Sequence, residues 1–250
     1  MELRAHKFLV TGGGSGIGRA IAERLLADGA SVVIAGRTES KLKQAASELG
    51  GDVYTLTLDI SDCESIPSKL LTAERLLGGL DGFVNAAALG CDQALGRGYE
   101  PFDITPDEWD TLNDINYKGA FFAMRDEIEF LLSRRCPGNI LNIASNAAYM
   151  GVTGSYGAAK TAIVRWTRAF GSRYGKYGIM INGIAPGATL TDMTKGYAKD
   201  TSQPYPRHAL GRFIRPEEIA LLAEYLLSTA GEIVCGHTVV ADAGDSQAVL

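Results

Sequence analysis

Short apolar runs alternate along the chain with longer stretches in which apolar residues return every three or four positions. The apolar runs predict strands that are buried on both faces, and the periodic stretches predict amphipathic helices. Strands are predicted at 7–11, 31–36, 52–59, 82–86, 139–144, 180–185 and 238–241. Helices are predicted at 16–28, 39–49, from 62 to the Gly78-Gly79 pair, and at 106–134, 155–174 and 216–227.

The alternation of strands and helices predicts the fold class. Parallel strands need long crossover connections, which helices provide. We therefore expect an α/β protein with one Rossmann-type domain over residues 1–250, in which helices cover both faces of a doubly wound parallel sheet. Thr105 is expected to cap the helix that begins at Pro106, together with Glu108. Asp62 is expected to open the helix before it, with Glu64 in the first turn.

Composition and charge narrow the classes of partner. The 250 residues are 46% hydrophobic and 21% charged, and the formal net charge is −5. The acidic balance argues against a nucleic-acid partner, and no apolar run reaches the length of a membrane span. The first residues lack the apolar region of a secretory signal, so a cytoplasmic location is expected. The four cysteines and three histidines show no metal-ligand spacing, so reduced thiols and no metal site are expected.

A glycine-rich turn joins the first predicted strand to the first predicted helix. Residues 11–18 read TGGGSGIG, which has the spacing G-x-x-x-G-x-G rather than the common G-x-G-x-x-G. Glycines let the backbone turn tightly and approach a pyrophosphate, and the helix N-terminus attracts the phosphates. The turn therefore predicts dinucleotide binding. A glycine-rich turn without a ligand is the alternative.

The end of the second predicted strand indicates which dinucleotide binds. A carboxylate there bonds the ribose 2′-hydroxyl of NAD, whereas an arginine accommodates the 2′-phosphate of NADP. Arg37 stands at this point, after Ala35 and Gly36, so NADP is predicted over NAD; an ordinary surface arginine is the alternative. Asp59 ends the third strand and is expected to accept a hydrogen bond from the adenine amine, or else to cap the following segment.

A tyrosine and a lysine on one helix face point to acid–base chemistry. Tyr156 and Lys160 are four residues apart, and Ser145 lies at the end of the preceding strand. A free tyrosine is a poor acid or base at neutral pH, and a nearby ammonium lowers its pKa. Tyr156 is therefore expected to exchange a proton with a carbonyl oxygen that Ser145 holds, while Lys160 also bonds the nicotinamide ribose.

In combination these motifs resemble the short-chain dehydrogenase/reductase family over essentially the whole chain. The matching segments are 11–18, Asp59, 85–88, Asn116, Ser145, 156–160 and 182–187. The resemblance implies hydride transfer between a nicotinamide and a carbonyl or secondary alcohol, with Asn116 in a water relay to Lys160. The resemblance and the motifs together give the expected cofactor residues Gly12, Gly14, Ser15, Gly16, Ile17, Gly18, Arg37, Asp59, Ile60, Asn85, Ala86, Ala87, Tyr156, Lys160, Pro186, Gly187, Thr189 and Thr191.

The chain departs from the family pattern at two places. The family commonly has Asn-Asn-Ala-Gly where this chain has Asn85-Ala86-Ala87-Ala88, so a side-chain hydrogen bond that steadies the sheet is expected to be missing at Ala86. The interval from Ser145 to Tyr156 is also shorter than in many members, which leaves Asn146 and Ser155 as alternatives to Ser145.

The substrate is expected to be a small carbonyl or alcohol compound that is covered by a lobe at about 188–213. The lobe contains Met193, Tyr197, Tyr205 and Phe213 for apolar contacts and Lys195, Lys199, Arg207 and Arg212 for an anion; a surface loop with solvated charges is the alternative. His208, in the same segment, is expected to be a solvated loop residue. The loop 89–101 and the residues Ala147, Ala148, Tyr149, Met150 and Val152 are expected to form the other walls. Sugars, steroids, acyl chains and small ketones all remain open.

Assembly and activity each leave an alternative. The resemblance implies a homotetramer, or else a homodimer, through the helices at 106–134 and 155–174. Burial of Phe121, Phe122, Trp166 and Phe170 within one subunit is the competing account. A non-catalytic dinucleotide sensor or scaffold, and an enzyme that catalyses dehydration or epimerisation, are the alternatives to a catalytic reductase.

Overall fold

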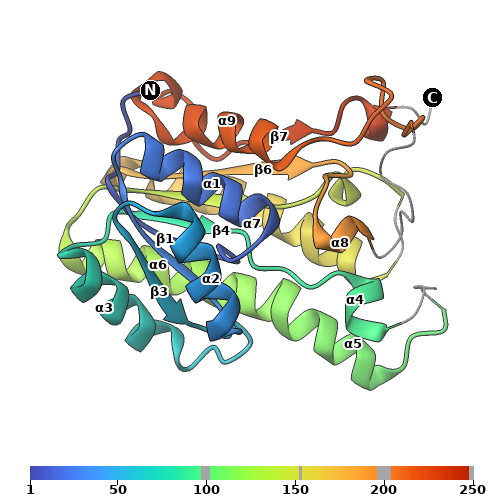
Figure 1. Cartoon of the computed structure of the whole chain (residues 1–250), viewed down its shortest axis with the longest axis horizontal. Helices are drawn as coiled ribbons and strands as arrows, with labels where there is room; N and C mark the ends of the chain where they lie inside the picture. The colour runs from blue at the N-terminus through green and yellow to red at the C-terminus, as the bar shows by residue number, and fades with distance from the viewer. Residues whose placement is uncertain (97–101, 152–153, 196–203, 248–250) are drawn as a thin grey trace.

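Seven parallel strands form the centre of the molecule. The computed structural model describes residues 1–96, 102–151, 154–195 and 204–247 (Figure 1). The strand order is β3-β2-β1-β4-β5-β6-β7, and every neighbouring pair is parallel. This is the predicted doubly wound sheet. The strands are β1 (Lys7–Thr11), β2 (Ser31–Gly36), β3 (Val53–Thr57), β4 (Gly82–Asn85), β5 (Gly138–Ile143), β6 (Ile179–Pro186) and β7 (Thr238–Ala241).

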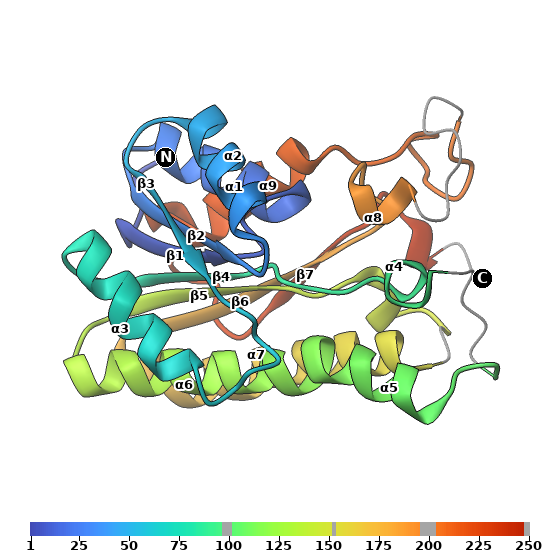
Figure 2. The same ribbon diagram turned by 60° about the horizontal axis from the view of Figure 1, so that its bottom comes forward.

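Helices cover both faces of the sheet, as Figure 2 shows. One layer holds α1 (Gly16–Ala27), α2 (Glu39–Leu49) and α9 (Pro216–Leu227), and the other holds α3 (Ile66–Leu77), α6 (Ala120–Arg134) and α7 (Ser155–Tyr174). Successive side chains of a strand point into two different cores. In β1, Phe8 and Val10 pack toward α1 and α9, whereas Leu9 packs toward α3 and α6. The period-two alternation of buried side chains therefore explains why the strands are apolar on both faces.

Several predicted boundaries are wrong by one or more residues. The helix predicted from Asp62 begins at Ile66, because residues 59–65 form turns in which Ser65 N–H donates to Asp62 O, so Glu64 precedes the helix. The third strand is shorter than predicted and ends at Thr57. The predicted loop 89–101 contains α4 (Cys91–Leu95), and the substrate lobe predicted at about 188–213 contains α8 (Asp192–Lys195).

The long helix predicted at 106–134 is three elements in succession. They are α5 (Pro106–Asn113), the π-helix η1 (Asp114–Gly119) and α6. The predicted cap is confirmed, because the Thr105 hydroxyl accepts from Glu108 N–H and the Glu108 side chain accepts from Thr105 N–H. A single π turn inside a helix often marks a functional position, and this one contains Asn116.

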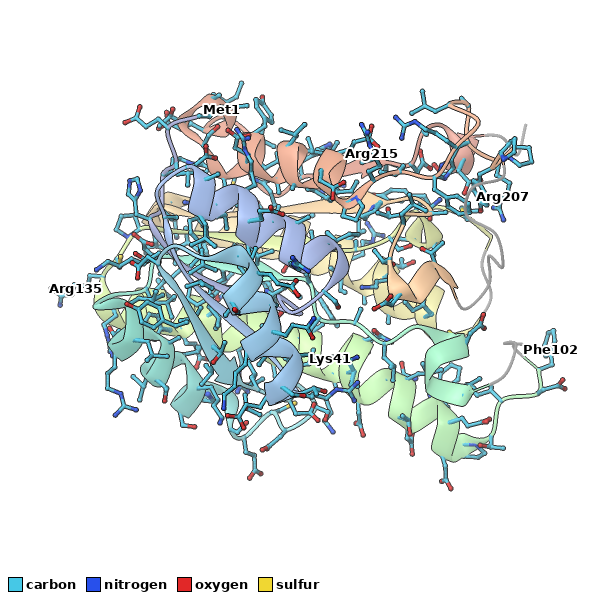
Figure 3. The ribbon with its side chains drawn as sticks, viewed as in Figure 1. Met1, Lys41, Phe102, Arg135, Arg207 and Arg215 are labelled. Atoms are coloured by element: carbon cyan, nitrogen blue, oxygen red, sulfur yellow. The ribbon has the colours of Figure 1, made fainter. Side chains whose placement is uncertain are left out.

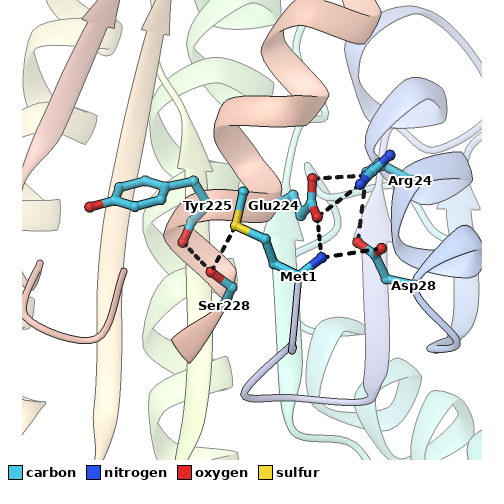
Figure 4. A network of polar contacts seen from close by, with 6 residues as sticks. All are labelled: Met1, Arg24, Asp28, Glu224, Tyr225 and Ser228. Atoms are coloured by element: carbon cyan, nitrogen blue, oxygen red, sulfur yellow. Dashed lines mark hydrogen bonds and ion pairs between the residues drawn. The ribbon is translucent and has the colours of Figure 1, made fainter. Parts of the chain in front are cut away.

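An ion network fastens α1 to α9 (Figure 4). Arg24 of α1 lies 2.8 Å from the buried Glu224 of α9, and the Met1 amine also contacts Glu224. The Asp28 carboxylate also forms ion pairs with the Met1 amine and with the Arg24 guanidinium. The hydrogen bond from Arg24, together with that from the Met1 amine, holds the pKa of Glu224 at about 2. The network therefore fixes the helix that carries the glycine turn.

A polar chain crosses the interior below β4 and β5. Asn85 donates one amide to Glu127 at 2.9 Å and to Asn142 at 3.0 Å, and Asn142 donates to Thr167 at 3.0 Å. Glu127 is only 2% exposed. Burial raises its pKa to about 8, with a further contribution from Asp126, against the lowering effect of the Asn85 bond. Asn85 therefore provides a side-chain tie between the sheet and α6 beside the position where Ala86 has none.

Glu127 should make stability fall as pH rises between about 4.5 and 8. In that window the carboxyl is ionised in the unfolded chain but keeps its proton in the folded protein, so the folded state binds more protons. The free energy of unfolding therefore falls by up to about 1.4 kcal/mol for each pH unit. Glu127→Gln should remove this slope and be the more stable protein near pH 8. Urea unfolding at several pH values measures it, with the exposed Glu129→Gln as control; equal slopes for parent and Glu127→Gln contradict the assignment.

Candidate active site

A cavity of about 310 Å³ opens at the carboxyl ends of the strands. It lies across the junction of β1 and β4, where the strand order reverses, which is the position at which ligands bind in open α/β sheets. Its lining comes from the residues that follow β1 to β6 and from the first turns of α1 and α7. Most of the predicted site residues line it: Gly12, Gly14, Ser15, Gly16, Ile17, Gly18, Arg37, Asp59, Ile60, Ala86, Ala87, Ser145, Tyr156, Lys160, Pro186 and Thr191.

The glycine turn is packed too closely for side chains. Gly12 has φ +69°, and a Cβ there would lie 2.8 Å from the Ala86 carbonyl carbon. A Cβ on Gly18 would lie 2.5 Å from Gly12 O. Within the described chain the Ser15 side chain makes no capping bond to α1, and Gly16, Ile17 and Gly18 of the first turn line the cavity. The turn is therefore a cradle that fits a dinucleotide pyrophosphate.

The far end of the cavity carries two cations. Arg37 follows β2 and Lys41 stands in the first turn of α2, labelled in Figure 3, and both side chains line the cavity. Lys41 was missed by the sequence analysis; its signal is its place one helical turn after Arg37 and Thr38. Asp59 both lines the cavity and caps the next turn, since Oδ1 accepts from Ser61 N–H at 3.0 Å and from its hydroxyl at 2.7 Å.

The Tyr156 and Lys160 pair lies at the other end of the cavity, beside Ser145. Lys160 is 2% exposed; its ammonium donates to Ile143 O at 3.1 Å and lies 5.5 Å from the centre of the Tyr156 ring. Burial lowers the pKa of Lys160 to about 8. The Ser145 hydroxyl accepts from Ala147 N–H at 3.2 Å. Two elements, β5 and α7, thus bring a phenol, an ammonium and a hydroxyl to one cavity.

Four predicted site residues stand outside the cavity lining. Both amide atoms of Asn116 are bonded to Leu89, with Oδ1 accepting at 3.0 Å and Nδ2 donating at 2.8 Å. The Asn85 amide donates to Glu127, and Asn85 does not line the cavity, so its role in cofactor binding stays a prediction. Gly187 packs against Asp242, and the Thr189 hydroxyl donates to Gly187 O. Roles for Asn116 in a water relay and for Gly187 and Thr189 at the nicotinamide remain predictions.

The substrate lobe is only partly as expected. Met193 lines the cavity, but Phe213 is buried and stacks on Tyr205, so it does not form a substrate wall. His208 is 2% exposed and not solvated; its Nδ1 pairs with Arg212 O at 2.8 Å. Arg207 and Arg212 form ion pairs with Asp245 and Glu218. Tyr197, Lys199 and Val152 lie outside the described residues.

The described residues contain neither a membrane-spanning helix nor a metal-binding cluster. No helix there is long and apolar enough to cross a membrane. The same part of the chain brings together no group of three or more histidine, cysteine, aspartate or glutamate side chains that could hold a metal ion. The four cysteines, at 63, 91, 136 and 235, are all free.

Known proteins resemble this chain over nearly its whole length. A sequence family described as enoyl-(acyl carrier protein) reductase matches residues 12–246. The 2,5-dichloro-2,5-cyclohexadiene-1,4-diol dehydrogenase of Sphingobium indicum is 36% identical over 97% of this chain and 98% of its own. Levodione reductase of Leifsonia aquatica is 32% identical over 96% of this chain and 94% of its own.

Solved structures agree with these relatives. A short chain dehydrogenase/reductase family protein has a TM-score of 0.85 at 32% identity, covering 99% of this chain and 100% of its own. A putative 2-deoxy-D-gluconate 3-dehydrogenase from Agrobacterium tumefaciens with bound NADP also has a TM-score of 0.85, at 30% identity, covering 98% of this chain and 97% of its own.

Gly18→Ala should weaken dinucleotide binding by at least about tenfold, because the added Cβ meets the backbone of Gly12 and must displace the turn. Calorimetry with NADPH on the folded variant measures the dissociation constant. Gly151→Ala is the matched control, since its Cβ would meet open space. Unchanged affinity in Gly18→Ala would show that the dinucleotide lies elsewhere.

Proposed function

This chain belongs to the short-chain dehydrogenase/reductase family and is an oxidoreductase acting on CH–OH or C=O groups, and we propose that it uses NADP(H) with Tyr156 as the acid and base. The observation that carries the proposal is the convergence of Ser145, Tyr156 and Lys160 on the cavity that the glycine turn also lines. The nicotinamide, when bound, provides or accepts the hydride.

Tyr156 moves the proton that accompanies the hydride. In reduction its hydroxyl gives a proton to the carbonyl oxygen, and in oxidation its phenolate takes the proton of the alcohol. The Lys160 ammonium, held by Ile143 O, stabilises the phenolate, because a positive charge near the ring favours the ionised form. Ser145 donates a hydrogen bond to the same substrate oxygen and fixes its place next to Tyr156.

The preference for NADP rests on charge at the cavity end beyond β2. Arg37 and Lys41 line the cavity there, and the segment 35–38 contains no carboxylate that would repel a phosphate. The Arg37 guanidinium can donate two parallel hydrogen bonds to a 2′-phosphate, and the Lys41 ammonium adds a second positive charge beside it. The Agrobacterium protein with bound NADP is consistent with this preference.

The substrate is proposed to be an uncharged ring alcohol or ketone. The substrate end of the cavity has Ala88 and Met193 in its lining, and a relative acts on a cyclohexadiene diol. Levodione and 2,5-dichloro-2,5-cyclohexadiene-1,4-diol are therefore the first probes.

The location is proposed to be the cytoplasm, where NADPH is available to a reductase.

Assembly into a homotetramer, or a homodimer, is proposed through α6 and α7. Trp166 and Phe121 have ring centres 5.1 Å apart, and Tyr117 packs edge-to-face against Trp166 with ring centres 4.9 Å apart. Tyr117 is exposed at the edge of this aromatic cluster, so the cluster extends from the core to the surface. An aromatic surface of this kind is typical of subunit interfaces.

Tyr156→Phe should lower kcat at least about a thousandfold and leave NADPH affinity unchanged, because it removes only the proton donor. Turnover of the two probes is followed by NADPH absorbance, and binding by protein fluorescence. Tyr54→Phe, on β3, is the control. Retained turnover would refute Tyr156 as acid and base; cofactor binding without turnover of any carbonyl or alcohol in the parent would favour a sensor.

Arg37→Asp should shift the ratio of NADPH to NADH affinity toward NADH by about tenfold or more, because a carboxylate repels the 2′-phosphate and bonds the 2′-hydroxyl. Calorimetric dissociation constants for both cofactors measure the ratio. Arg75→Asp, an exposed site on α3, makes the same charge change away from the cavity. An unmoved ratio would place the phosphate contact elsewhere.

A further inference from the structure

We propose that Asp245, held by Arg207, orients the Asn146 amide and through it the hydroxyl of Ser145, so that all three are positioning residues for hydride transfer. This inference rests on the proposed function, in which Ser145 holds the substrate oxygen. It assigns a task to a segment after β7 and to a residue of the substrate lobe that lies far from Ser145 in the sequence.

A continuous chain of hydrogen bonds leads to Ser145. Asn146 Nδ2 donates to Asp245 Oδ2 at 3.1 Å, and Arg207 Nε donates to Asp245 Oδ1 at 3.0 Å. The Ser145 hydroxyl donates to Asn146 Oδ1 at 3.4 Å. Asn146 is 8% exposed and Asp245 is 5% exposed, whereas Arg207 reaches solvent at the end of the molecule opposite Met1 (Figure 3).

The carboxylate decides which way the amide faces. An ionised carboxylate only accepts hydrogen bonds, so it selects the NH₂ end of Asn146 and turns the oxygen end toward Ser145. The Arg207 guanidinium neutralises the charge that burial would otherwise make costly. Asp242, the neighbouring carboxylate of the same turn, accepts from Gly244 N–H and Ser246 N–H and also bonds the Asn146 side chain, so both carboxylates select the NH₂ end of the amide.

The amide in turn decides the direction of the serine proton. Ser145 Oγ already accepts from Ala147 N–H, and its proton points to Asn146 Oδ1. At 3.4 Å this bond is longer than the usual range for O–H···O, so it aims the proton and holds it weakly. A substrate oxygen that arrives beside Tyr156 can therefore replace Asn146 Oδ1 as the acceptor of the Ser145 hydroxyl. With the amide reversed, an N–H would face Ser145 and the direction of its proton would be undefined.

Asp245→Asn tests the orientation, because an amide at 245 can face Asn146 with either end. We expect kcat with levodione and NADPH to fall about tenfold to a hundredfold, as mispositioned reacting groups do. The dissociation constant of NADPH and the urea midpoint should stay at the parent values, since the cofactor cradle is untouched. Arg207→Gln should lower kcat in the same direction.

A reciprocal exchange provides the rescue. Asn146→Asp alone places two carboxylates together and should abolish turnover, whereas Asn146→Asp with Asp245→Asn restores one carboxylate and one amide. A carboxylate at 146 accepts from Ser145 and from the amide at 245, so part of kcat should return although Asp242 also lies beside position 146. Glu218→Gln is the matched control: it neutralises the partner of another lobe arginine, Arg212, and should leave kcat unchanged.

The outcomes separate this inference from the proposed function. A kcat of Asp245→Asn within about twofold of the parent, a parallel loss of NADPH affinity and stability, or no rescue by the exchange in a folded protein would each overturn the positioning role. If the parent turns over no carbonyl or alcohol probe, the proposed function fails. The orientation is then decided by the side-chain amide signals of Asn146 in ¹⁵N NMR: slow exchange that is lost in Asp245→Asn supports it, and identical signals refute it.

Discussion

The active site depends on the close contact between the glycine turn and the end of β4. Gly12 and Gly18 lie so near to each other and to Ala86 that no Cβ fits between them. This contact lets α1 begin directly over the sheet, so that its N-terminus and the strand ends face one cavity. The ion network of Arg24 with Glu224 then holds α1 against α9 and keeps the turn in place.

The residues of the proposed chemistry come from both sides of the strand junction. The glycine turn, Arg37 and Lys41 come from β1, β2 and the helices after them, whereas Ser145, Tyr156 and Lys160 come from β5 and α7. Lys160 links β5 to α7, because its ammonium donates to Ile143 O at the end of β5 while it lies beside the Tyr156 ring. The buried chain from Glu127 to Thr167 ties β4 and β5 together directly beneath.

Local patterns were sufficient to predict the strands, most helices and the residues of the glycine turn, since each depends on periodicity or on backbone conformation within a few residues. They were not sufficient where the partner is distant. Glu127 meets Asn85 from 42 positions along the chain, and Asp245 meets Asn146 from 99 positions. His208 was expected to be a solvated loop residue and Phe213 to contact the substrate, but tertiary packing buries both, Phe213 against Tyr205 and His208 against Arg212.

The π turn at Asp114–Gly119 sets the rotational phase between two halves of a long helical segment. A residue of an α-helix advances the direction of its side chain by about 100°, so a π turn offsets everything after it by one such step. Asn116 can therefore face Leu89 while Glu127 faces Asn85 under the sheet. If one residue were deleted at this turn, a regular α-helix could form, but Asn116 and Glu127 could no longer both face their partners. The chain should therefore tolerate substitutions here far better than insertions or deletions.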